Sequence, residues 1–216
     1  MPGPILFINP NSDTRVTGSI AEAARFDDRA NERLSLEFLT IASAPRTIST
    51  DQDVREASDK VCDIVRSRPD AAGFVIACFS DPGLEAAQAL TRVPVIGIQR
   101  ASVAAAIAIA GKFGVIALSD RSIPRHKAEY AKLGVSGHLA AEVGLSDVSA
   151  LAAGTSEAAF QESLGAGRTL IDRGARSIVL GCAGFSPRRA ALQARLGVPV
   201  IDPVKAASAM VRSVVG

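Results

Sequence analysis

The chain has 216 residues, with 24 basic and 22 acidic side chains, so its formal net charge is only +2. A charge this close to neutral argues against a dedicated nucleic-acid or membrane-surface binder. Hydrophobic residues make up 48% and charged residues 21% of the chain, which is typical of a packed soluble protein with one large or two small domains.

The three cysteines, Cys62, Cys78 and Cys182, are too few for a disulfide framework. Residues 1–8 carry no basic segment, and their apolar run is too short for a signal peptide or a membrane span. We therefore expect a cytoplasmic protein. Its cysteines would be either buried as small hydrophobes or kept as thiols for chemistry.

The first predicted element is a strand over Ile5–Asn9, followed by a helix that Ser12 caps. Val16 and Ile20 lie on the apolar face of that helix. Alternating apolar residues then predict a second strand near Leu34–Ile41.

Further along, apolar residues at helical spacing predict a helix over Asp51–Arg66, and Gly73–Cys78 reads as a buried strand. The Ala-rich stretch Ala101–Ala110 predicts a tightly packed helix, and Val204–Val215 predicts the last one. Such alternation of strands and helices is typical of an α/β protein with parallel sheets.

The two halves of the chain resemble each other. Cys78 and Cys182 each end an apolar strand and lie 104 positions apart, and the prolines that follow them, Pro94 and Pro199, lie 105 apart. Both spacings are close to half the chain. The simplest explanation is a pair of related lobes.

The opening strands support this, because Leu6–Asn9 matches Val115–Leu118 at a spacing of 109. We therefore expect an α/β fold of two pseudo-symmetric lobes, each a parallel sheet flanked by helices, with the active site in the cleft between them. The first lobe would comprise residues 1–98 plus 204–216, with the last helix returning to it, and the second residues 99–203.

Ligands of open α/β sheets bind at the carboxyl ends of the strands, where both cysteines are expected. Helix amino ends there would lower a thiol pKa towards neutrality. Two opposed thiols suit the inversion of a carbon next to a carbonyl, one removing the proton and the other delivering one, without metal or organic cofactor. The developing oxyanion would be held by the backbone N–H groups of Phe79, Ser80, Ala183 and Gly184.

Three ordered motifs cover nearly the whole chain: Ile8-Asn9-Pro10-Asn11-Ser12, the segment Ala77–Leu84, and Leu180–Gly184 followed by Gly197–Pro203. With these motifs the chain resembles the aspartate/glutamate/hydantoin racemase superfamily, and its hydantoin and allantoin racemase branch in particular. The resemblance implies a two-lobed fold, cofactor-independent catalysis and Cys78 with Cys182 as the acid/base pair.

The resemblance also implies that Asn11 and the residues after each cysteine contact substrate, and we add Ser119 to them. Members of this branch often carry a Thr-Thr pair where this chain has Ala117-Leu118 before Ser119. The difference bears on the substrate more than on the reaction.

Structural roles compete with these assignments. A single cysteine at a strand end is more often buried than catalytic, whereas two in matched positions favour catalysis. Cys62 lies on the predicted helix and is assigned to core or half-buried packing, and the Asn11 side chain suits a turn as well as it suits a ligand contact. Two isolated histidines, His126 and His138, lack zinc-ligand spacing and receive no role, so no metal site is expected.

The leading hypothesis is a racemase acting on a 5-substituted hydantoin, allantoin or a related small amino-acid derivative. Alternatives on the same scaffold are an aspartate/glutamate-type racemase and a maleate isomerase-like or arylmalonate decarboxylase-like enzyme. A non-enzymatic alternative is a small-molecule binding protein or thiol redox sensor. We expect a small-molecule substrate, a homo-oligomer, and neither nucleic acid nor membrane as partner.

Overall fold

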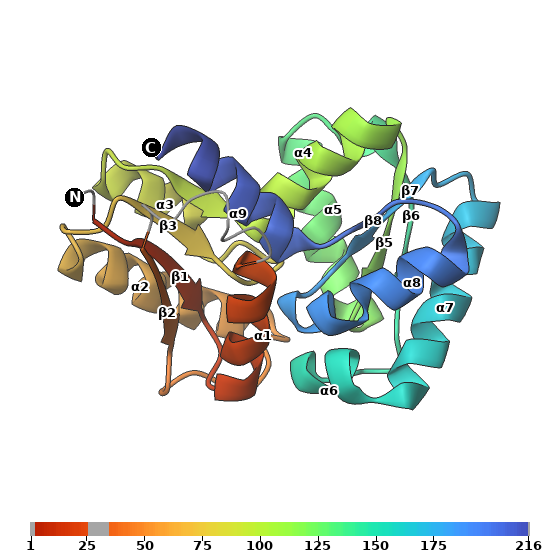
Figure 1. Cartoon of the computed structure of the whole chain (residues 1–216), viewed down its shortest axis with the longest axis horizontal. Coiled ribbons are helices and arrows are strands. Elements are labelled where there is room, and N and C mark those ends of the chain that lie inside the picture. Colours follow the sequence, from red (N-terminus) through yellow and green to blue (C-terminus); the bar gives the residue numbers. More distant parts are fainter. Residues whose placement is uncertain (1–2, 26–34, 216) are drawn as a thin grey trace. The chain divides into compact units, whose positions relative to one another are not determined.

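The computed structural model describes residues 3–25 and 35–215, and its strands form two parallel sheets of four strands each (Figure 1). The first has the order β2-β1-β3-β4, and the second the order β6-β5-β7-β8. The first sheet comprises β1 (Ile5–Asn9), β2 (Leu36–Thr40), β3 (Gly73–Ile76) and β4 (Val95–Gly97). The second comprises β5 (Phe113–Ala117), β6 (Leu139–Gly144), β7 (Ser177–Leu180) and β8 (Val200–Ile201). The shared strand order confirms the internal repeat.

The chain divides into two compact units. The first runs to Ala101 and resumes at Val204, and the second is Ser102–Pro203. The chain leaves the first unit inside helix α4 (Ile98–Ala110), three residues later than the sequence suggested. It returns at the start of helix α9 (Pro203–Val214).

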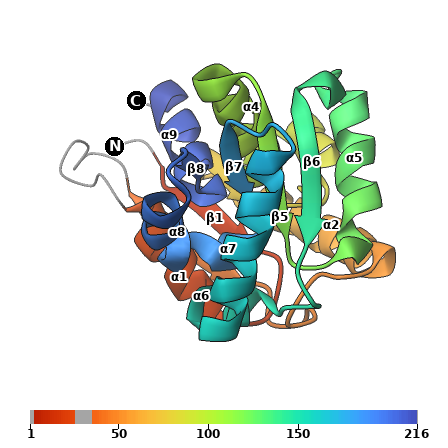
Figure 2. The ribbon, with the colours of Figure 1, turned by 90° about the vertical axis from the view of Figure 1, so that its right-hand side faces the viewer.

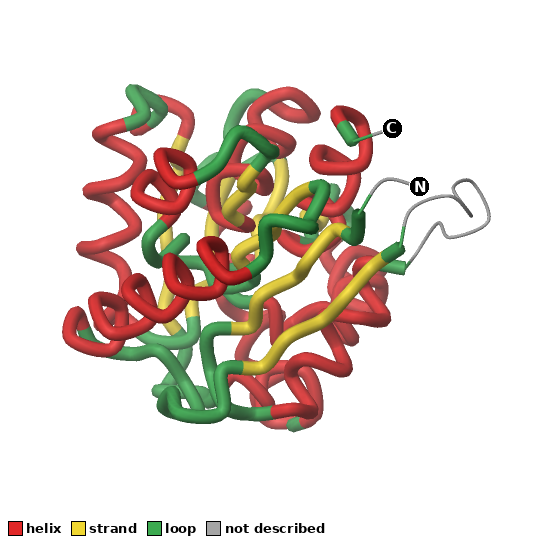
Figure 3. Tube along the Cα trace, turned by 90° about the vertical axis from the view of Figure 1, so that its left-hand side faces the viewer, coloured by secondary structure: helices red, strands yellow, loops and turns green. Residues whose placement is uncertain are grey.

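One core cluster of the first unit lies between its sheet and helices α2 (Asp51–Ser67) and α3 (Leu84–Leu90). A capping box, in which Thr50 and Asp53 each bond the other's backbone N–H, starts α2 at the predicted residue. The core side chains include Leu6, Ile8, Val61, Val65, Phe74 and Ile76. In Figure 3 the two neighbouring strands near the N-terminus, β1 and β2, run side by side.

Helix α1 (Thr14–Ala24) buries Val16 and Ile20 as expected, but its N-cap is Asp13 and the prediction of Ser12 was wrong. The Asp13 carboxylate accepts from the Arg15 amide, while the preceding residues form a turn after β1. The predicted second strand is shorter than expected, and Leu34 lies outside the described residues.

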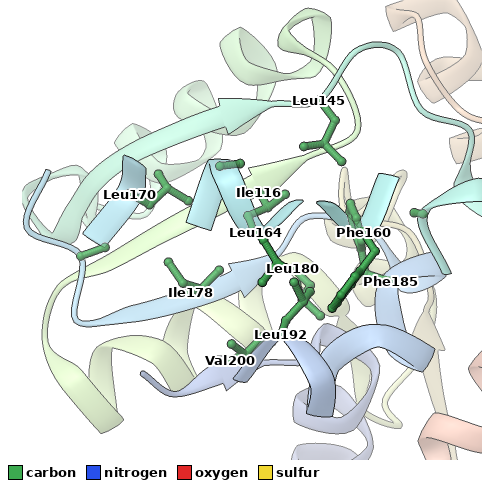
Figure 4. Close-up of a cluster of buried hydrophobic side chains, with 13 residues drawn as sticks. Ile116, Leu145, Phe160, Leu164, Leu170, Ile178, Leu180, Phe185, Leu192 and Val200 are labelled. Atoms are coloured by element: carbon green, nitrogen blue, oxygen red, sulfur yellow. The ribbon is translucent and has the colours of Figure 1, made fainter. Parts of the chain in front are cut away.

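In the second unit, helix α7 (Glu157–Asp172) lies across β5, β6 and β7 (Figure 2). Helices α5 (Ile123–Lys132), α6 (Ala150–Thr155) and α8 (Arg189–Leu196) and the short 3-10 helices η2 (Asp120–Ser122), η3 (Ser136–His138) and η4 (Ala183–Arg188) complete it. Figure 4 shows the apolar cluster on the α7 side, with Ile116, Leu164, Leu180 and Phe185 at its centre.

None of the helices in the described ranges combines the length and the apolar character of a membrane span.

Candidate active site

Both paired cysteines lie two residues beyond a central strand. Cys78 follows β3 and Cys182 follows β7, and each is partly exposed. Because β1 pairs with β3 and β5 pairs with β7 in parallel, the segments after these strands meet at one sheet edge in each unit. In the first unit that edge carries Asn11 and Cys78, and in the second it carries Ser119 and Cys182. These positions are where ligands of α/β sheets bind.

One further ladder bond extends each strand pair towards its cysteine. The Ala77 amide donates to the Ile8 carbonyl at 2.8 Å, and the Gly181 amide donates to the Ile116 carbonyl at 2.8 Å. A methyl group at position 181 would lie 2.6 Å from that Ile116 oxygen, so only glycine allows this approach. The residue before each cysteine is therefore held by the neighbouring central strand.

A tight loop leads from Cys78 to α3. The Cys78 carbonyl accepts from the Asp81 amide at 2.9 Å, and Asp81 has a φ of 43°, which is unusual for a residue other than glycine. The Asp81 carboxylate accepts from the backbone amides of Gln99 and Arg100, at 2.9 and 3.0 Å, and so caps the start of α4. This contact ties the Cys78 loop to α4.

The Cys182 thiol caps the 3-10 helix η4. Its Sγ accepts from the Gly184 amide at 3.3 Å, which is the interaction a thiolate at this place requires. Burial nevertheless raises the pKa of Cys182 to about 11, against the opposing effect of that hydrogen bond. The expected lowering towards neutrality is therefore wrong for Cys182, because desolvation outweighs one neutral N–H donor.

Two close backbone approaches hold the loop after Cys182. A methyl group at Gly184 would lie 1.8 Å from the Ala150 carbonyl oxygen, and one at Gly154 would lie 2.4 Å from the Gly184 carbonyl oxygen. Arg188, at the end of η4, donates to the carbonyl oxygen of Gly154 at 3.1 Å. Helix α6 thus forms a fixed support for the loop.

The other residues predicted to contact substrate differ in how far they are exposed. Phe79 and Ala183 are buried, at 3% and 2% exposure, so their side chains offer little surface to a ligand. Ser80 is partly exposed. Ser119 is also partly exposed and caps η2, where its hydroxyl accepts from the Arg121 amide at 3.3 Å.

Cys62 lies in the core of the first unit, as predicted, and burial raises the pKa of its thiol. His126 lies on helix α5, in agreement with the predicted surface or helix face, and is buried there with its Nδ1 2.5 Å from Glu142 Oε1. Across the described ranges, no group of three or more His, Cys, Asp or Glu side chains is arranged to hold a metal ion.

Sequence reasoning missed two residues that shape the site. Asp81 gives no sequence signal, because its cap on α4 joins positions 18 residues apart. Asn9 could have been found, since a buried strand that ends in an asparagine must satisfy that amide nearby.

Comparison with known proteins shows the family and the fold. The profile of the family described as Asp/Glu/Hydantoin racemase matches residues 5–211. A hydantoin racemase from Paenarthrobacter aurescens is 34% identical over 98% of this chain and 90% of its own length. The solved structure of an allantoin racemase from Klebsiella pneumoniae has a TM-score of 0.87 and 32% identity, and covers 99% of this chain and 87% of that one.

More distant structures share the fold alone. A glutamate racemase from Bacillus anthracis has a TM-score of 0.76 at 17% identity, over 98% of this chain and 81% of its own.

Proposed function

Because this chain belongs to the Asp/Glu/Hydantoin racemase family, we propose that it inverts a carbon next to a carbonyl by a two-thiol mechanism. It is a racemase, and the substrate we propose is a 5-substituted hydantoin or allantoin. The substrate class is supported by relatives named for hydantoin and allantoin at 34% and 32% identity, compared with 17% for a glutamate racemase.

The observation that carries the mechanism is the matched placement of two thiols. Each follows the equivalent central strand of its own unit, two residues after the last paired residue. The thiolate of one cysteine takes the proton from carbon, and the C–H electron pair moves into an enolate-like intermediate. The thiol of the other cysteine then delivers a proton to the opposite face. The two cysteines thereby exchange protonation states in each turnover.

The protein favours this chemistry through backbone amides. The Gly184 amide donates to Cys182 Sγ and so stabilises a thiolate there instead of making the predicted oxyanion contact. The Ala183 amide is the group after Cys182 that we propose for the oxyanion. The raised pKa of Cys182 makes its thiolate a stronger base towards a weak carbon acid, and makes its thiol a correspondingly weaker proton donor.

The test compares three cysteine variants on single enantiomers of allantoin and of a 5-substituted hydantoin. We expect Cys78→Ser and Cys182→Ser each to lower the racemisation rate by roughly 10²–10⁴-fold, measured by polarimetry. Each variant should still exchange the α-proton of one enantiomer in deuterated water. Cys62→Ala is the matched control and should keep the wild-type rate, because Cys62 is a buried residue of α2 with a role in packing. Full racemisation by either serine variant would exclude the two-thiol mechanism.

A further inference from the structure

Two asparagines flank Pro10 where β1 ends, and their side chains form one hydrogen-bonded cluster. Asn9 is the last residue of the strand and is fully buried, and Asn11 is 8% exposed. The cluster also includes Asp13 and Thr17, and Thr40 on β2 is bonded to Thr17 at 2.6 Å between the hydroxyl oxygens.

Backbone donors fix the orientation of both amides. The Asp13 N–H donates to Asn11 Oδ1 at 3.0 Å, and the Asn11 N–H donates to Asn9 Oδ1 at 3.2 Å. A backbone N–H can only donate, so each partner atom must be the amide oxygen. The side-chain nitrogens of Asn9 and Asn11 therefore lie on the opposite sides of their amide groups.

The Asn9 nitrogen is then directed at the Asn11 oxygen. Asn9 Nδ2 donates to Asn11 Oδ1 at 3.0 Å, and also lies 2.9 Å from Thr17 Oγ1 and 3.3 Å from the Asp13 carbonyl oxygen. Asn11 Oδ1 accepts two hydrogen bonds and has no further acceptor capacity. Among the described residues, none accepts a hydrogen bond from Asn11 Nδ2.

We propose that Asn9 is a positioning residue that locks the Asn11 amide with its oxygen inward, so that Asn11 offers a ligand only N–H donors. The proposal rests on the proposed function for the identity of the ligand. A carbonyl or carboxylate oxygen of the substrate would meet Asn11. A ring N–H would be rejected there, because two donors would face each other. In a hydantoin or in allantoin, a carbonyl oxygen is therefore the group bound at Asn11.

The orientation can be tested without substrate by NMR of the side-chain amides. We expect nuclear Overhauser contacts from the Asn9 Nδ2 protons to the Thr17 side chain, and only weak contacts from the Asn11 Nδ2 protons to the Asp13 amide proton. A strong contact between the Asn11 Nδ2 protons and the Asp13 amide proton would mean a reversed amide and would overturn the proposal.

Ligand binding tests the consequence. The dissociation constant of allantoin, measured by calorimetry, should rise about tenfold in Asn9→Ala and in Asn11→Ala, which is the effect of one ordinary hydrogen bond. The double variant should bind no more weakly than Asn11→Ala, because Asn9 acts through Asn11. Effects that multiply to about 100-fold, or an Asn9→Ala variant with wild-type affinity, would overturn it. Thr40→Val is the matched control within the cluster, and should lower the melting temperature while leaving affinity unchanged.

A second variant covers the case in which Asn9→Ala does not fold. Asn11→Asp keeps an oxygen for both inward donors and replaces the outward donor by an acceptor. It should fold like the wild type and bind allantoin at least tenfold more weakly, and unchanged affinity would overturn the proposal. If the wild type neither binds nor racemises allantoin or a hydantoin, the proposed substrate fails, while the NMR measurement still decides the orientation.

Discussion

At the scale of single residues, two thiols with raised pKa values have different surroundings. Cys62 is buried on α2, where desolvation raises the pKa of its thiol and the charge of Arg66 opposes that effect. Cys182 lies two residues beyond the central strand β7, and the Gly184 amide is directed at its sulfur. Burial keeps both protonated in the resting protein, but the geometry at Cys182 is suited to a transient thiolate.

The pKa of Cys182 makes stability depend on pH in the alkaline range. Burial raises that pKa from 9.0 to about 11, so the unfolded chain loses this proton first as pH rises. The stabilisation is fully present below pH 9 and is lost as pH rises through about 11. Between pH 9 and about 11, the free energy of unfolding measured in urea should fall by about 2 kcal/mol more in the wild type than in Cys182→Ala. Parallel curves for the two proteins would contradict the shift.

The contribution of the Asp81 carboxylate to stability can also be measured by itself. Asp81→Ala removes the acceptor of two backbone amides at the start of α4, and should lower the free energy of unfolding by about 2 kcal/mol in urea titrations. Asp81→Asn keeps one oxygen and should lose less. The control is Glu85→Ala, which breaks a surface ion pair with Arg100 and should cost under about 1 kcal/mol. Equal losses for Asp81→Ala and Glu85→Ala would contradict the capping role.

At the scale of secondary-structure elements, backbone contact between α6 and η4 decides where Cys182 lies. The two segments approach so closely that glycines are required at positions 154 and 184. Arg188 reinforces the contact by donating to the Gly154 carbonyl oxygen and by lying over the Phe160 ring, 5.1 Å from its centroid. Displacing α6 should therefore move the loop that carries the thiol.

Two helical glycines of the second unit provide a matched test of this contact. Gly154→Ala places a methyl group 2.4 Å from a backbone oxygen, and should lower the unfolding free energy by about 1–3 kcal/mol and change the alkylation rate of Cys182. Gly165→Ala in α7 meets nothing within 4 Å and should stabilise by about 0.5–1 kcal/mol. A stabilising Gly154→Ala would show that α6 can move away at no cost.

At the scale of the whole molecule, the first unit is built from two distant pieces of chain. Helix α9 returns to it, where Ser208 and Arg212 both donate to the Ala24 carbonyl oxygen at 3.0 Å. Val211 is fully buried, and its methyl group lies 3.0 Å from where a side chain at Gly73 would begin. Helix α9 is therefore part of the buried interior of the first unit.

Two valines of α9 test that assignment. Val211→Ala removes buried methyl groups and should lower the free energy of unfolding by about 2 kcal/mol. Val214→Ala, at a side chain that is 65% exposed, should stay within about 0.5 kcal/mol of the wild type. Chemical denaturation of both variants gives the comparison, and equal effects would exclude α9 from the core.

The local sequence pattern was enough to predict the repeated alternation of strands and helices. Buried parallel strands are short apolar runs, and the helices that cover them keep a 3.6-residue period. Element boundaries such as the start of α2 could be predicted where capping chemistry is local. The N-cap of α1 could not, since Ser12 and the neighbouring Asp13 are both favoured N-cap types, and it is the Asp13 carboxylate that accepts from the Arg15 amide.

By itself the sequence determined the alternating strands and helices, the repeat and the placement of Cys78 and Cys182 after equivalent strands, because these depend on residues close together in the chain. Only the tertiary structure decided the raised pKa of Cys182 and the cap that Asp81 places on α4, 18 residues further along the chain. Desolvation and hydrogen-bond geometry arise from neighbours that the fold brings together.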